Sequence, residues 1–100
     1  MNTQRTSVFL MANLGSEVSR ILSAKDRNNN LQVRESLERA LNILKEIMTI
    51  SDMKTRIVEM NTLSDLINEM AKPKPIFHVS RKNISSYFIP FVLKAMNVKV

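Results

Sequence analysis

Apolar residues recur along most of the chain at spacings of three and four, the period of an α-helix. Because 3.6 residues complete a helical turn, side chains at this spacing lie on one face and can be buried together. Over residues 7–25 the apolar stripe comprises Met11, Leu14, Val18, Ile21 and Leu22. The pattern predicts a first helix over residues 7–25, with Ser7 as its N-cap. Gly15 lies inside this helix, either at a close helix crossing or by accident.

Two more helices follow from the same spacing. Residues 26–30 are polar and rich in asparagine, which favours a turn before a second helix over residues 31–50. Ser51 is a suitable cap for a third helix over residues 52–71, although one long bent helix remains an alternative. The side chains expected inside are Val33, Leu37, Ala40, Leu44 and Ile47 in the second helix, and Met53, Ile57, Met60, Leu63, Ile67 and Met70 in the third.

The strongest break in the pattern is the sequence Lys72-Pro73-Lys74-Pro75. Proline cannot continue a helix and drives the residue before it towards extended geometry, so residues 72–79 are interpreted as a linker. A fourth helix is expected over residues 80–100, with Ser80 as its N-cap and a kink at Pro90. Its apolar stripe is Ile84, Tyr87, Phe88, Phe91 and Ala95.

These elements predict an all-α fold in a single domain of residues 1–100. Residues 7–71 are expected to form a small antiparallel bundle of three core helices, closed by the proline-kinked helix at the C-terminus. Composition agrees, because the 100 residues include one glycine, too few for the turns of a β-fold. Cysteine is absent, which excludes disulfides. With no apolar run of transmembrane length and no signal peptide, a cytoplasmic location is expected.

Charge divides the chain into two unequal parts. Residues 1–69 contain nine Lys or Arg and nine Asp or Glu, whereas residues 70–100 contain six cations and no acid. The whole net charge of +6 therefore belongs to the last third, which also holds four of the five aromatic residues. In the second helix, Arg34 with Glu38 and Glu35 with Arg39 are spaced as solvated ion pairs.

The basic, aromatic last third has two interpretations. In the first, the aromatic side chains pack on the three-helix core and the cations are merely solvated. In the second, the chain is a nucleic-acid-binding adaptor in which cations contact phosphates and aromatic rings stack on bases. The candidate contacts are Lys72, Lys74, Arg81, Lys82 and Lys94. Packing is favoured, because the aromatic residues keep the spacing of a core stripe.

Candidate catalytic chemistry is sparse. Ser51 and Lys54 match a Ser-x-x-Lys spacing, but the companion motifs of that enzyme class are missing and helix capping explains Ser51. His78 is the only histidine and has no acidic neighbour, so a metal site is not expected there. The sequence predicts no enzyme activity, no cofactor and no bound metal.

The first helix begins with four consecutive apolar residues, Val8, Phe9, Leu10 and Met11. Successive residues step about 100° around a helix, so one buried stripe cannot hide all four. They are the candidate association surface, and part of it is expected to meet either a second chain or the C-terminal helix. A homodimer is the favoured form of the second chain, with another protein as the alternative. The leading hypothesis is a small non-enzymatic interaction or regulatory module that acts through helix–helix association, with the nucleic-acid-binding adaptor as the alternative.

Overall fold

The structure is a computed structural model, and it describes residues 6–50, 55–72 and 81–95. The described residues form four α-helices and no strand, which confirms the all-α prediction. Helix α1 spans Ser7–Asp26, α2 spans Asn30–Met48, α3 spans Ile57–Ala71 and α4 spans Arg81–Ala95. Within the described ranges, no helix is both long enough and apolar enough to cross a membrane.

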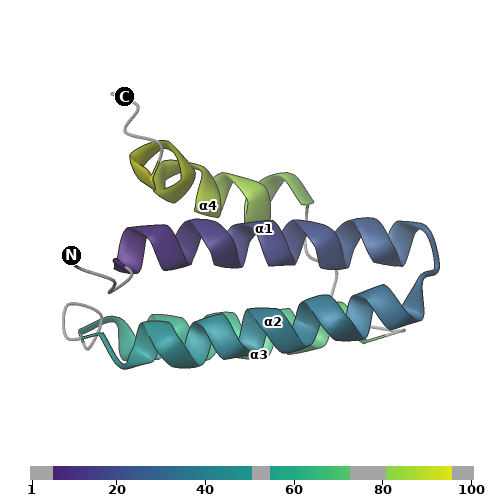
Figure 1. Ribbon diagram of the computed structural model, residues 1–100, viewed down its shortest axis with the longest axis horizontal. Coiled ribbons are helices and arrows are strands. Elements are labelled where there is room, and N and C mark those ends of the chain that lie inside the picture. The colour runs from purple at the N-terminus through teal and green to yellow at the C-terminus, as the bar shows by residue number, and fades with distance from the viewer. Residues whose placement is uncertain (1–5, 51–54, 73–80, 96–100) are drawn as a thin grey trace, which may run out of the picture.

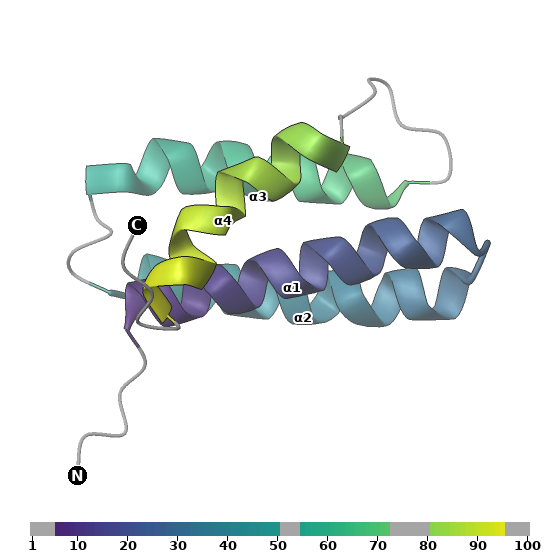
Figure 2. The same cartoon turned by 90° about the horizontal axis from the view of Figure 1, so that it is seen from above.

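Helix α1 lies at the centre of the molecule. Helices α2 and α3 cover one side of it and α4 covers the other (Figure 1). Seen from above, α4 crosses obliquely over α1, with its last turns above the first half of that helix (Figure 2). Helix α1 packs against each of the other three, whereas α4 packs mainly on α1. The core is therefore assembled around α1.

The turn between α1 and α2 confirms the role expected of the asparagine-rich segment. Asn28 has a positive φ of 56°, a left-handed conformation that asparagine tolerates better than most residues. The amide of Asn29 donates to the carbonyl of Ala24 at 2.8 Å, and the amide of Asn28 donates to that of Lys25 at 3.1 Å. This pair of bonds is a Schellman motif, which satisfies carbonyls that the end of a helix would otherwise leave open.

The starts of the helices differ in detail from the predictions. Thr6, not Ser7, caps α1, because its side-chain oxygen accepts from the amide of Phe9 at 3.1 Å. Asn29 caps α2 by accepting from the amide of Gln32 at 3.1 Å. The third helix begins at Ile57, five residues later than predicted, and the proposed cap Ser51 lies outside the described residues.

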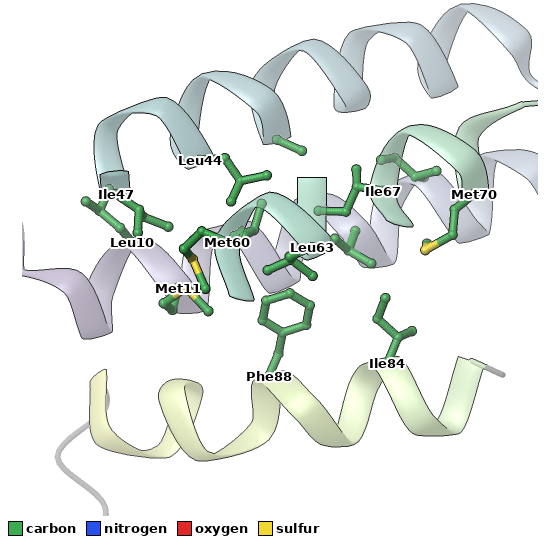
Figure 3. Packing of buried hydrophobic residues seen from close by; sticks show 14 of the residues in the cluster. Leu10, Met11, Leu44, Ile47, Met60, Leu63, Ile67, Met70, Ile84 and Phe88 are labelled. Carbon is green, nitrogen blue, oxygen red and sulfur yellow. The ribbon is translucent and has the colours of Figure 1, made fainter. Parts of the chain in front are cut away.

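Buried apolar side chains from all four described helices form one cluster (Figure 3). Leu44 and Ile47 of α2 and Met60 of α3 are buried there, as predicted. Two predictions were wrong: Leu37 is only half-buried, and Ile57 is 45% exposed. Ile57 lies about 100° from the middle of the buried stripe of α3 and in its first turn, where neighbours cover only one side. The core positions of the outer helices are Val33, Ala40, Leu44 and Ile47 in α2, Met60, Leu63, Ile67 and Met70 in α3, and Ile84 and Phe88 in α4.

Helix α4 contains Pro90 and is helical on both sides of it. The kink expected there stays a prediction. The proposed cap Ser80 and most of the linker, residues 73–79, lie outside the described residues. Ile84 and Phe88 are buried, so the packing interpretation of the apolar stripe is correct for these two positions.

Candidate functional site

The docking of α4 on α1 depends on the single glycine of the chain. A Cβ atom built at Gly15 would lie 2.8 Å from both Cβ and Cγ of Phe88 and 3.1 Å from its Cδ1. Ordinary contacts between carbon atoms are about 3.5–4.0 Å, so any larger residue at position 15 would collide with Phe88. Of the two explanations for Gly15, the close helix crossing is therefore correct.

A polar cluster joins the other edge of α4 to α3. Arg56 donates to both carboxylate oxygens of Glu59, at 2.9 Å and 2.5 Å, and the hydroxyl of Tyr87 donates to Glu59 as well. The guanidinium of Arg56 also lies 5.6 Å from the centre of the Phe91 ring, within cation–π range. These contacts connect the first turn of α3 with the middle of α4.

The same contacts shift the acid–base properties of this cluster. The pKa of Glu59 is lowered, first by the hydrogen bond from Arg56 and then by the one from Tyr87, because both favour the carboxylate. Burial, followed by the hydrogen bond to Glu59, raises the pKa of Tyr87 to about 12. Glu59 therefore stays ionised and the Tyr87 phenol stays neutral, as their hydrogen bond requires, over a wide range of pH.

An apolar groove lies between α3 and α4 beside this cluster. The backbones of α3 and α4 make little direct contact, because each packs separately on other helices. The groove has a volume of about 240 Å³ and is lined by Leu63, Leu66, Ile84 and Tyr87, together with Glu59 and Asn83. We call this surface the α3–α4 groove. Figure 3 shows Leu63 of α3 and Ile84 of α4 in the space between these two helices.

A second polar cluster lies between α1 and α2, next to a hollow in the surface. Glu17 is nearly buried and accepts from Arg20 at 2.8 Å and from Arg39 of α2 at 3.1 Å. Arg39 also donates at 3.2 Å to Ser36, which is completely buried. The adjoining hollow, which we call the α1–α2 cleft, has a volume of about 440 Å³ and is lined mainly by polar side chains.

The four residues of the candidate association surface differ in how deeply they are buried. Leu10 and Met11 are fully buried in the core of the single chain. Val8 is half-buried and Phe9 is 45% exposed. Only Val8 and Phe9 therefore have surface left for contact with a second chain.

The candidate nucleic-acid contacts are only partly covered by the structure. Lys72 is exposed at the end of α3, where its ammonium group pairs with Glu69 at 2.8 Å. Lys82 is exposed in the first turn of α4, and Arg81 and Lys94 lie within that helix. Lys74 lies outside the described residues, as do Ser51, Lys54 and His78. Among the described residues, no group of three potential metal ligands comes together.

Sequence reasoning missed the two polar clusters. It paired Arg39 with Glu35 on the solvent-facing side of α2, whereas Arg39 donates to Glu17 of α1. A signal was present, because Glu17 stands three residues after Leu14 and four before Ile21, within the buried stripe of α1. A charged residue at such a position requires a partner. No comparable signal marked the bond between Glu59 and Tyr87, which are 28 residues apart.

Comparison of the chain with models of known protein families, with curated proteins and with solved structures found no match.

Proposed function

We propose that the chain is a non-enzymatic interaction module that binds a helix of a partner protein in the α3–α4 groove. The observation that carries this proposal is the apolar lining of the groove by Leu63, Leu66, Ile84 and Tyr87. Two helices that diverge over an apolar floor offer the kind of surface on which the apolar face of an amphipathic helix docks. Burial of that face would drive the association.

The groove suits this role better than the start of α1 does. Leu10 and Met11 already serve the core of the chain, so their exposure to a partner would require local unfolding. Leu66 and Tyr87 are only half-buried and are accessible in the folded state. Association through the groove therefore leaves the helical fold intact.

Charge indicates the chemistry of the partner helix. Helix α4 contains three cations, Arg81, Lys82 and Lys94, and no acid. On the facing helix, Glu59 is paired with Arg56 and Glu69 with Lys72, so two of its three acids are already compensated. A partner with acidic residues along one side of its apolar stripe would gain favourable contact with α4.

Peptide binding tests the proposal. Two labelled amphipathic helical peptides share one apolar stripe, and one carries acidic and the other basic residues beside it. In fluorescence anisotropy we expect the acidic peptide to bind at least about tenfold more tightly, because like charges repel along α4. The substitution Leu66→Asp should abolish binding. The matched control Thr62→Asp, at an exposed position of the same helix, should not. Failure of both peptides to bind a folded chain would contradict the proposal.

The nucleic-acid-binding adaptor is the second candidate function. It is supported by the acid-free sequence of α4 and by the exposure of Lys82. The burial of Phe88 counts against it, because a buried ring cannot stack on a base. We expect a labelled oligonucleotide to bind weakly and to dissociate near physiological salt. A complex that persists at that salt and requires Lys82 would reverse the ranking of the two functions.

The proposal also includes two features of the fold: antiparallel packing of α1, α2 and α3, and a kink in α4 at Pro90. Antiparallel packing would hold α3 at a fixed distance from α4. The kink would set the direction of the last turns of α4. Proline lacks an amide hydrogen and its ring collides with the carbonyl four residues earlier, here that of Ser86, which supports the kink. Residual dipolar couplings measured before and after Pro90 should report two helix directions. A single direction would exclude the kink.

A further inference from the structure

A second hollow lies on the outer side of α1, close to the start of α2. It has a volume of about 310 Å³ and is lined by Ser19, Arg20, Ser23, Arg27 and Gln32. Each of these side chains carries a hydrogen-bond donor and none carries a carboxylate. Its two cations are Arg20, which is paired with the adjacent Glu17 at 2.8 Å, and Arg27. We call this surface the arginine–serine hollow.

Arg20 is fixed at the edge of this hollow by a nearly buried carboxylate. Its guanidinium donates to Glu17 at 2.8 Å, and the side chain of Glu17 is only 10% exposed. Arg39 holds the other oxygen of that carboxylate from α2 and is itself bonded to the buried Ser36. Glu17 thus has a fixed position from which to orient Arg20.

The bond between Arg20 and Glu17 compensates a nearly buried carboxylate and also restricts the side chain of Arg20. Arg39 alone connects Glu17 to α2, whereas Arg20 is three residues from Glu17 on the same helix. The Arg20 bond therefore joins no two helices. Its effect is to restrict a long side chain that stays 55% exposed, and a guanidinium group has five N–H donors, more than this one bond uses. Donors held in place before a ligand arrives lose less entropy when it binds.

We propose that the arginine–serine hollow binds the phosphate group of a small phosphate ester. Two guanidinium groups and two hydroxyl groups match the acceptor oxygens of a phosphate, and arginine binds such oxygens with paired hydrogen bonds. The α1–α2 cleft adjoins the hollow, since Arg20 lines both, and it has room for the organic part of the ester. Asn13 and Asn42 line that cleft and offer amide groups to a polar organic part. The site is independent of the α3–α4 groove, because the two are lined by different residues.

Binding of inorganic pyrophosphate to the full chain, followed by isothermal titration calorimetry at constant ionic strength, tests the proposal. We expect Arg20→Gln and Arg27→Gln each to weaken binding by at least about tenfold, because each removes a charge-assisted bond. The matched control Lys45→Gln removes an exposed cation at the other end of α2 and should leave binding unchanged. Equal weakening in all three variants would show nonspecific attraction and would overturn the proposal.

The substitution Glu17→Gln distinguishes two effects of Glu17 on anion binding, the orientation of Arg20 and the repulsion by its negative charge. Removal of a nearby negative charge should strengthen anion binding if only charge matters. If Glu17 orients Arg20, the same substitution should weaken pyrophosphate binding although the local charge becomes more positive. Circular dichroism must first show that the variant folds. If Glu17→Gln does not fold, the affinity of the Arg20→Gln variant alone tests the proposal. Affinity that is unchanged in Arg20→Gln, or higher in a folded Glu17→Gln, would contradict the proposed role of Glu17 and Arg20.

Discussion

Replacement of Gly15 by alanine tests how α4 is attached to the rest of the protein. In an open helical position this change stabilises a protein by up to about 1 kcal/mol, because alanine favours the helix. Here the new methyl group would lie 2.8 Å from Cβ and Cγ of Phe88. To remove this overlap, the methyl group and Phe88 must move apart by about 1 Å, which restores ordinary contact distances of about 3.5–4.0 Å.

Rotation of the Phe88 ring cannot supply that shift, because one of the colliding atoms is Cβ, whose position the backbone sets. Helix α4 itself must move away from α1. Overpacking of this kind costs about 1–3 kcal/mol. After the gain in helix propensity is subtracted, we expect Gly15→Ala to lower the free energy of unfolding by up to about 2 kcal/mol. The loss should be measured by urea denaturation followed by circular dichroism.

A double-mutant cycle with Phe88→Ala identifies the cause of the loss. Without the ring, α4 can recede more easily, so the cost of Gly15→Ala should fall. The recovery should be partial, because Cβ of residue 88 remains. A coupling of about 1–2 kcal/mol is expected between these neighbouring sites. If Gly15→Ala instead raises the stability of the otherwise unchanged chain by about 1 kcal/mol, the close crossing at Gly15 is refuted.

Three further predictions concern the core, the Tyr87 cluster and assembly. Leu44→Ala should cost about 2–5 kcal/mol in urea denaturation, because Leu44 is 2% exposed, and a negligible loss would place it outside the core. Tyr87 is the only tyrosine, so ultraviolet titration of the folded chain should show a pKa of about 12. Glu59→Gln should lower that value only in part, since burial is the larger cause. As the folded pKa lies above the unfolded value of about 10, this group's contribution to stability should be constant below that pH and decline as the pH rises to about 12. Light scattering at high micromolar concentration should give twice the chain mass of 11.5 kDa if the predicted homodimer forms, and a single-chain mass would exclude it.

The helices were predictable because each has a distinct apolar period. The asparagine-rich turn was also readable, since few residues other than glycine accept the positive φ found at Asn28. The start of α3 was not, because Met53 and Ile57 keep the apolar spacing, whereas the helix begins only at Ile57, which is 45% exposed. Periodicity identifies the face of a helix, but the neighbours decide where along the helix burial begins.

The candidate sites were less predictable than the fold, because they depend on contacts between distant parts of the chain. The α3–α4 groove exists only because the two helices pack on other elements, and no local pattern of Leu66 or Tyr87 indicates that arrangement. Glu17 was the exception, since a charge inside an apolar stripe requires a partner. Its partner Arg39 could not be chosen from sequence alone, because Glu35, one helical turn away, offered an equally suitable pairing.

Nuclear magnetic resonance of the labelled chain, titrated with the acidic amphipathic peptide, tests the central claim most directly. Chemical-shift changes should concentrate at Leu63, Leu66, Ile84 and Tyr87, which line the α3–α4 groove. The signals of Leu44, buried on the side of α1 away from α4, should stay unchanged. Changes centred on Val8 and Phe9, or an absence of changes at saturating peptide, would contradict the claim that the groove is the binding surface.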